Sequence, residues 1–393
     1  MTLCPKMLKF TEFAKYCVTA MRITTPTLLL DKQKAQQNIR RMVEKAQRNN
    51  VRLRPHFKTH QSAQVGEWFR EAGVSVITVS SVRMAQYFAN HGWDDILVAF
   101  PANVLEMESI NELASRIKLH LVAVNIETVE ALAKHLKHPA HLWLKIDTGY
   151  RRTGILPHDH ADLDEILQLT DRSEKLTFEG FVVHDGHTYK QTDIDAIQTI
   201  HNTSVYQLHL LRDRYQKQFP NLRLSIGDTP SCSILEDLSG VDEIRPGNFV
   251  FFDLTQQRIG SNAYEEIAVC MVCPVVAKHQ ERGEIILYGG SVHFSKDSLI
   301  QEDGSVVYGA IVELTENGWT APVEGIELVS LSQEHGIVKA SPRQFEKYKI
   351  GDVMGILPVH SCLTADLMRR YLTTEGEWLE HFSGVPQTAQ KVY

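Results

Sequence analysis

Cysteine is scarce in this sequence of 393 residues, and its positions follow no regular spacing. A small secreted scaffold is held by an even set of cysteines at framework spacings, and this sequence has no such set. Sparse cysteine is instead typical of a protein in a reducing compartment. The six cysteines are Cys4, Cys17, Cys232, Cys270, Cys273 and Cys362.

Long apolar runs and an excess of positive charge are also missing. No stretch approaches the ~18 consecutive apolar residues that a membrane span requires. Lys and Arg number 41 against 48 for Asp and Glu, a net charge of −7, which argues against nucleic acid or an anionic membrane as a partner. Lys6, Lys9 and Glu12 interrupt the N-terminal segment, so we do not expect it to be a signal peptide. We therefore expect a cytoplasmic protein.

Between about residues 50 and 250, short β-branched runs alternate with longer stretches of helical periodicity. Strands separated in this way by helices run parallel, and eight such units in roughly 200 to 250 residues match a (β/α)8 barrel better than an open sheet. The predicted strands are 52–56, 76–80, 96–100, 119–124, 142–146, 177–183, 222–226 and 243–245.

After about residue 260 the sequence changes to short strand-like runs between Gly, Pro or charged turns, with one helix expected at 365–372. This pattern predicts a second, mainly β domain. We therefore expect an α/β protein with an N-terminal arm (1–25), a barrel domain (26–255) and a C-terminal β domain (256–393).

Lys58 follows the first predicted barrel strand, and active sites of such barrels lie where the strands end. A lysine at the mouth of an apolar barrel is partly desolvated, which lowers the pKa of its ammonium group. The resulting neutral amine can form an imine with a carbonyl compound. The alternative is a solvated rim lysine, and position alone does not decide between the two.

Two further loops on this rim offer glycines, hydroxyls and backbone N–H groups that suit a phosphate. The loop after the seventh strand contains Gly227 and Thr229, and the loop after the eighth contains Gly247 and Asn248. Taken singly, each loop is also ordinary turn chemistry. An imine-forming lysine and a phosphate cradle on one rim are, however, what pyridoxal phosphate requires, so together they predict that cofactor.

Arg152 follows the fifth predicted strand. A guanidinium group there can hold the phenolate of the cofactor or a substrate carboxylate by charge-assisted hydrogen bonds. The alternative is a surface arginine, and the neighbouring Arg151 shows that the sequence does not choose between them.

His360 and Cys362 are two residues apart in the predicted β domain. On an extended segment their side chains point to one face, as two metal ligands do. Histidine plus thiolate suits zinc, and two protein ligands leave positions open for water or substrate. The alternative is a polar core histidine beside a small buried cysteine. We expect Cys270 and Cys273 in the apolar core, since no second pair accompanies them.

With these motifs assembled, the chain resembles the D-serine dehydratase and D-threonine aldolase group of pyridoxal-phosphate enzymes, which share the alanine racemase fold. The resemblance extends from Thr25 to the His360 motif. Its most specific pieces are Arg54-Pro55-His56-Phe57-Lys58-Thr59-His60, Asp147-x-Gly149-x-x-Arg152-x-Gly154, Arg245-Pro246-Gly247-Asn248, and Glu334-His335-Gly336 followed by His360-x-Cys362.

The resemblance implies roles for individual residues. Lys58 carries the cofactor and Arg152 meets the phenolic oxygen of its ring. Tyr189 lines the cofactor. The pair at 360 and 362 matches the zinc ligands of the dehydratase branch, whereas the aldolase branch typically has His-x-Asp there. Members of this fold typically form homodimers. The residues implied to hold the phosphate region are Gly227, Thr229, Gly247 and Asn248.

One departure from the family pattern is Val182, which stands where dehydratases of this kind usually carry a tyrosine. The sequence predicts a lyase that uses pyridoxal phosphate and zinc and acts on a small D-amino acid, most simply a D-serine dehydratase that forms pyruvate and ammonia. Retro-aldol cleavage on the same site is the nearest alternative, with His187 as a candidate base. A racemase is a weaker alternative because racemisation needs no metal. A non-catalytic pyridoxal-phosphate carrier is disfavoured by the additional β domain.

Overall fold

The computed structural model describes residues 21–382, so most of the predicted N-terminal arm lies outside the described residues. The described chain forms two compact units. Residues 36–263 and 380–382 make up the first, here called the barrel unit, and residues 21–35 and 264–379 make up the second, the β unit. Between residues 21 and 382, no helix is both long enough and apolar enough to cross a membrane.

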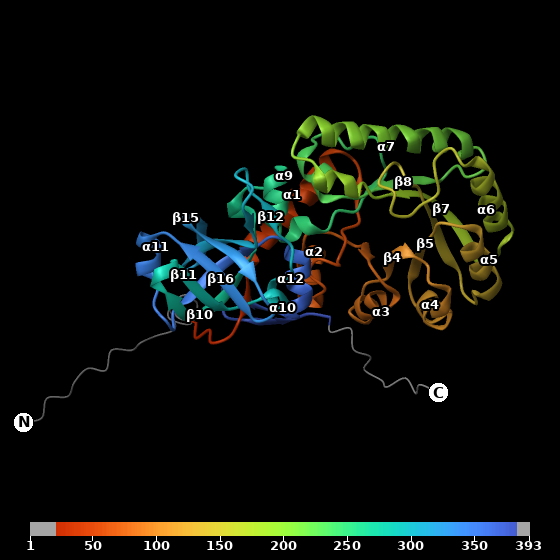
Figure 1. Cartoon of the computed structure of the whole chain (residues 1–393). Helices are drawn as coiled ribbons and strands as arrows, with labels where there is room; N and C mark the ends of the chain where they lie inside the picture. The colour runs from red at the N-terminus through yellow and green to blue at the C-terminus, as the bar shows by residue number, and fades with distance from the viewer. Residues whose placement is uncertain (1–20, 383–393) are drawn as a thin grey trace, which may run out of the picture. The chain divides into compact units, whose positions relative to one another are not determined.

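The barrel unit contains an eight-stranded sheet in which every neighbouring pair is parallel (Figure 1). A bridge between His56 and Thr78 joins the two edges, and the Phe57 N–H donates to the Thr78 carbonyl at 2.8 Å. The predicted (β/α)8 barrel with a second, mainly β domain is therefore confirmed. In the order β2-β9-β8-β7-β6-β5-β4-β3, the strands are β2 (Arg52–Leu53), β9 (Glu243–Ile244), β8 (Arg223–Ile226), β7 (Leu176–Val183), β6 (Ala140–Lys145), β5 (Lys118–Ala123), β4 (Asp95–Pro101) and β3 (Ile77–Val79).

Helices alternate with these strands, and polar side chains cap several of their first turns. Ser62, Ser81 and Asn125 each accept a hydrogen bond from the backbone N–H three residues later, which satisfies an otherwise unpaired donor. The helices are α1 (Lys32–Arg48), α2 (Ala63–Glu71), α3 (Val82–Asn90), α4 (Met107–Ala114), α5 (Ile126–His135), α6 (His160–Arg172), α7 (Ile194–Tyr215), α8 (Thr229–Ile234) and α9 (Leu254–Ile259), with short 3-10 turns η3 (Val104–Glu106), η4 (Gly186–Lys190) and η5 (Asn248–Val250).

The β unit is built on a nine-stranded sheet, in which the pairs from β11 to β1 are antiparallel and β1 pairs with β18 in parallel. Cys270 and Cys273 are fully buried in it, as expected. The strands are β11 (Glu284–Tyr288), β16 (His335–Ala340), β15 (Gly318–Leu331), β14 (Gly309–Thr315), β17 (Val353–Pro358), β10 (Val269–His279), β1 (Thr27–Leu30), β18 (Arg370–Thr373) and β19 (Trp378–Glu380), beside a ribbon of β12 (Leu299–Ile300) and β13 (Val306–Val307), helices α10 (Ser291–Phe294), α11 (Pro342–Lys347) and α12 (Ser361–Met368), and turns η6 (Tyr264–Glu266) and η7 (Gln280–Arg282).

Three local predictions are wrong. Strand β1 lies within the predicted barrel domain, but it pairs with β10 and β18 of the β unit, where its apolar side chains are buried. The helix expected at 365–372 begins at Ser361 and ends at Met368, because Arg369 takes a left-handed conformation (φ 56°) and strand β18 follows. His360 and Cys362 consequently do not lie on an extended segment: β17 ends at Pro358 and Cys362 is already helical.

Candidate functional site

The loops predicted to carry the chemistry follow β2, β6, β7, β8 and β9. In a closed parallel barrel all strands end at the same edge, so these loops share one rim. The predicted cofactor residues therefore belong to one end of the barrel unit. The predicted metal pair lies in the β unit.

The loop that carries Lys58 is held by an aromatic anchor. Phe57 is fully buried, whereas the Lys58 side chain that follows it is exposed. The Lys58 N–H donates to Nδ1 of His56 at 3.3 Å, which fixes the backbone between them. The expectation of partial desolvation is thus wrong for the free chain, because the chain leaves the barrel wall at His56 and Lys58 lies on the rim beyond it. The rings around Phe57, at centroid distances of 4.9 to 5.1 Å, are those of Phe69, Phe88 and Trp93.

Positive charge gathers around Lys58. Lys145, at the end of β6, is buried, and burial lowers the pKa of its ammonium group to about 8, helped by the charges of Arg152, Arg245 and Lys58. Arg152 is exposed, with Cζ of its guanidinium group 4.9 Å from the centroid of the Tyr150 ring, and its charge helps to lower the pKa of His184. Four cations in one place form a site for an anion.

Beside this cluster lie His56 and His184, two half-buried histidines to which the sequence assigned no role. Burial first, and then the charge of Lys58, holds the pKa of each imidazole well below its ordinary value. Both rings are therefore neutral at physiological pH. Nδ1 of His184 contacts the carbonyl of Gly227, which ties the loop after β7 to the loop after β8. The available signal is their position at the ends of predicted strands, since His56 is the last residue of 52–56 and His184 follows 177–183.

The loops after β7, β8 and β9 meet at Thr229. The backbone N–H of Thr229 donates to the Tyr189 hydroxyl at 3.1 Å, and the Asn248 N–H donates to the Thr229 hydroxyl at 3.2 Å. Two glycines permit the close approach. A Cβ at Gly227 would lie 2.8 Å from Cβ of Arg245, and a Cβ at Gly247 would lie 2.9 Å from the carbonyl oxygen of His56. The predicted phosphate residues are thus brought together.

This donor set fits pyridoxal phosphate. Lys58 offers a primary amine, the surrounding cations match a phosphate and a carboxylate, and Thr229 and Asn248 present polar groups where the tight glycine loops leave room. His187 lies on the same rim with its ring stacked on that of Tyr150, at a centroid distance of 6.0 Å.

In the β unit, His360 caps helix α12 and Cys362 lies in its first turn. The sequence missed a third group, Asp297, whose Oδ2 lies 3.4 Å from Nδ1 of His360 and accepts a hydrogen bond from the Ser295 hydroxyl at 2.7 Å. Carboxylate contacts of this kind orient metal-binding histidines, and they leave Nε2 as the ligand atom. Histidine, thiolate and a nearby carboxylate fit zinc. No spacing motif links Asp297 to the pair, since it lies 63 positions before His360 in the sequence.

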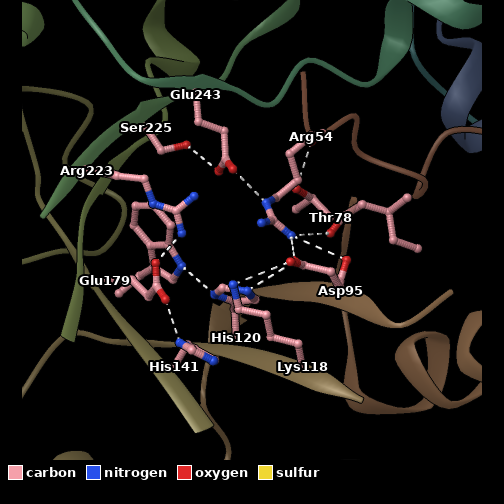
Figure 2. Close-up of polar contacts among 12 residues, drawn as sticks. Arg54, Thr78, Asp95, Lys118, His120, His141, Glu179, Arg223, Ser225 and Glu243 are labelled. Atoms are coloured by element: carbon pink, nitrogen blue, oxygen red, sulfur yellow. Dashed lines mark hydrogen bonds and ion pairs between the residues drawn. The ribbon is translucent and has the colours of Figure 1, made fainter. Parts of the chain in front are cut away.

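A second group of possible metal ligands lies near the starts of the barrel strands. His120, His141 and Glu179 bring their ligand atoms within 4.8 Å of one another (Figure 2). These groups already have partners, because Glu179 pairs with Arg223 and with Nδ1 of His141. Trp143 Nε1 donates to Nδ1 of His120 at 3.1 Å, which leaves Nε2 of that ring to carry the proton toward a carboxylate. We therefore attribute this cluster to the stability of the barrel.

Comparisons with known proteins agree with this geometry. Residues 30–255 match the family described as alanine racemase, N-terminal domain, and residues 268–374 match a putative serine dehydratase domain. The chain is 31% identical to a D-serine dehydratase of Dictyostelium discoideum, covering 89% of this chain and 93% of that protein. It is 29% identical to a D-threo-3-hydroxyaspartate dehydratase of a Delftia species, covering 88% and 93%.

More distant relatives and solved structures extend the comparison. A 3-hydroxy-D-aspartate aldolase of Paracoccus denitrificans is 22% identical, covering 89% of this chain and 88% of that protein. The solved structure of the Delftia dehydratase superposes with a TM-score of 0.86 at 27% identity, covering 93% of this chain and 99% of that one. A cysteine-to-alanine variant of that dehydratase was solved in a metal-free form.

Three findings lead to one conclusion. The barrel carries Lys58 on its rim, a β unit accompanies the barrel, and both parts match family models. The chain belongs to the D-serine dehydratase group of enzymes with the alanine racemase fold, which are pyridoxal-phosphate-dependent lyases.

Proposed function

We propose that this enzyme is a D-serine dehydratase that carries pyridoxal phosphate on Lys58 and binds zinc through His360 and Cys362. One observation supports this proposal most. The Lys58 amine, the neighbouring cations Lys145 and Arg152, and the Thr229 cradle, meaning Tyr189, Thr229 and Asn248 with their hydrogen bonds, all belong to one rim of the barrel. A solvated rim lysine without a role in binding or catalysis would not require these neighbouring groups.

Each group on the rim then has a task. Bound pyridoxal phosphate supplies the sink for the electrons that are left when Cα loses its proton. Nζ of Lys58 is the base that takes this proton. The guanidinium group of Arg152 orients the phenolic oxygen of the cofactor by a charge-assisted hydrogen bond. The neutral rings of His56 and His184 line the site without adding further positive charge.

Zinc at His360 and Cys362 supplies Lewis acidity toward the hydroxyl group that leaves from Cβ. The donor set supports this assignment, and so does the metal-free form of the Delftia dehydratase after loss of a cysteine. Asp297 orients the histidine. The proposal also includes a homodimer in the cytoplasm with a small D-amino acid as its substrate, and a division into barrel and β domains near residue 255.

A second candidate substrate is D-threo-3-hydroxyaspartate. Its additional carboxylate matches the surplus of cations around Lys58, and a relative 29% identical to this chain is named for that substrate. Aldol cleavage of a D-β-hydroxy amino acid, with His187 as base, remains the alternative reaction, since one relative is named as a 3-hydroxy-D-aspartate aldolase.

The test is an incubation of purified protein, loaded with pyridoxal phosphate and zinc, with D-serine, D-threo-3-hydroxyaspartate, D-threonine and their L-enantiomers. We expect ammonia and a 2-oxo acid from D-serine, and loss of this activity in Lys58→Ala but not in the exposed control Lys137→Ala. Glycine plus an aldehyde as the products would decide for the aldolase. No product from any D-amino acid would contradict the proposal.

A further inference from the structure

Two buried carboxyl groups beneath the Thr229 cradle are not used by the proposed reaction. Asp185 follows β7 and is fully buried, and Asp228 follows β8 with 1% of its surface exposed. The Oδ1 atom of Asp185 accepts hydrogen bonds from the hydroxyls of Thr148 and Ser204, at 3.0 and 2.7 Å. Both aspartates are therefore built into the fold.

Asp228 is bonded in the same one-sided way. Its Oδ1 accepts from the Ser231 N–H at 2.7 Å, which caps helix α8, and from the Thr188 hydroxyl at 3.0 Å. The same hydroxyl lies 2.7 Å from the carbonyl oxygen of Asp185, so Thr188 links the two aspartates. The other oxygen of each carboxyl group, Oδ2, is buried and has no hydrogen-bond partner among residues 21–382. A buried ionised oxygen without a donor is costly, whereas a protonated one is not.

The charges around the pair favour a single proton. Arg245 is buried close by, with its guanidinium group donating to Ser225 and to the carbonyl of Val183. Its one positive charge also faces the Glu243 carboxylate, so it offsets at most one carboxylate of the pair. Cys232, the other titratable group that acts here, stays a neutral thiol because burial raises its pKa. Two ionised carboxylates would leave one negative charge uncompensated.

We propose that Asp185 and Asp228 jointly retain one proton, and that this protonated pair positions the cradle of Tyr189 and Thr229 for the phosphate of the cofactor. Asp185 opens the turn η4 that carries Tyr189, and Asp228 caps the helix that begins with Thr229. Loss of the proton places two like charges behind a site for an anion. The two aspartates are thus positioning residues, and the inference rests on the proposed cofactor site.

The pH window follows from the same neighbours. Burial raises the pKa of Asp185 to about 7, with the charge of Asp228 adding to the effect, and burial raises the pKa of Asp228 to about 6. As pH rises through this range the pair loses its last proton, so phosphate affinity falls. A phosphate monoester itself gains charge near pH 6, which would strengthen binding and so opposes this effect. Lys145, whose ammonium pKa burial lowers to about 8, loses charge over the same range, which weakens binding whether or not Asp185 titrates.

The experiment titrates the apoprotein with pyridoxine 5′-phosphate, which has no aldehyde and so forms no imine with Lys58. Between pH 6.5 and 8.5 we expect the affinity to fall about 10- to 30-fold, following the protonated fraction of the pair. Asp185→Asn keeps an acceptor for Ser204 but has no proton to lose, so its affinity should fall clearly less than that of the unsubstituted protein, by the part that Lys145 contributes. The exposed control Asp171→Asn should behave as the unsubstituted protein.

A measurement on the unsubstituted protein tests the proposal even if the Asp185→Asn variant does not fold. The infrared band of a neutral carboxylic acid should be present at pH 6.5 and disappear by pH 8.5. Three results would each overturn the proposal that Asp185 and Asp228 retain a proton. They are an affinity that does not depend on pH, the same pH dependence in Asp185→Asn as in the unsubstituted protein, and absence of this infrared band. Failure of pyridoxine 5′-phosphate to bind at any pH would instead overturn the proposed cofactor site.

Discussion

The hydroxyl of Tyr189 accepts a hydrogen bond from the backbone N–H of Thr229 at 3.1 Å, which joins the turn after β7 to the first residue of helix α8. The two residues are 40 positions apart in the sequence. Tyrosine and threonine at these positions are thus parts of one binding surface, and each holds the other in place for a phosphate.

Tyr189→Phe should weaken the binding of pyridoxal phosphate about 3- to 10-fold, because it removes one neutral hydrogen bond and keeps the ring. Equilibrium titration followed by cofactor absorbance measures the change. Tyr206→Phe, on an exposed residue, is the matched control. An unchanged affinity in Tyr189→Phe would show that this hydroxyl does not shape the cradle.

The hydrogen-bond partner of His360 leads to a second prediction. Asp297→Asn keeps the shape of the side chain but removes the negative charge beside Nδ1, so zinc affinity should fall about 10- to 100-fold. Competition with a chelating dye measures it. Asp303→Asn is the control, since Asp303 is an exposed turn residue. Equal zinc affinity in both variants would remove Asp297 from the metal site.

The barrel could be predicted from the sequence because its signals are local. Strand β7 ends in the apolar run Phe181-Val182-Val183, and helix α5 begins directly after its cap Asn125. The alternation of such segments determines the fold class. Lys58 and the glycine loops could be placed on one rim for the same reason, since every parallel strand ends at that edge.

The site residues that could not be predicted from the sequence depend on contacts between segments that are far apart in the chain. Lys145 looks like the end of an ordinary strand until Arg152 and Arg245 are seen to share its surroundings. Asp297 has no periodic relation to His360. The helical start at Ser361 is not predictable from the sequence, because apolar β17 continues to Pro358 and the residues after it carry no strong helical pattern.

Val182, the departure from the family pattern, permits a third prediction. Its side chain is buried in a core cluster with Leu97, Val122 and Trp143. Val182→Tyr adds a ring to this packed interior, so the free energy of unfolding should fall by about 1–3 kcal/mol. Urea unfolding measures it, with Val182→Ile as the smaller control substitution. An unchanged free energy of unfolding in Val182→Tyr would mean that the interior has space for the tyrosine that the family usually carries there.

His120 makes stability depend on pH in a defined direction. Burial lowers the pKa of this imidazole to about 4, although a hydrogen bond to Asp95 opposes the shift. Between pH 6.5 and 4 the unfolded chain therefore binds a proton that the folded barrel does not, and the free energy of unfolding falls as pH falls. His120→Asn should reduce this slope by up to about 1.4 kcal/mol per pH unit. Urea unfolding at several pH values tests it, and exposed His135→Asn should leave the slope unchanged.

The pair of Arg54 and Glu243 provides the last prediction (Figure 2). Both side chains are fully buried, and Nε of Arg54 donates to Oε2 of Glu243 at 2.8 Å, while Nη1 contacts Asp95 at 2.5 Å. Arg54→Met leaves the Glu243 carboxylate with the Ser225 hydroxyl, which donates at 2.9 Å, but without the guanidinium charge. The free energy of unfolding should therefore fall by about 3–5 kcal/mol.

The double variant Arg54→Met with Glu243→Gln separates the pair from simple loss of packing. Because the glutamine carries no charge, the double variant should be more stable than Arg54→Met alone, and the two single costs should not add. Urea unfolding of the four proteins completes the cycle. Additive costs would show that Arg54 acts through its packing and its bond to Asp95 and not through the charge of Glu243.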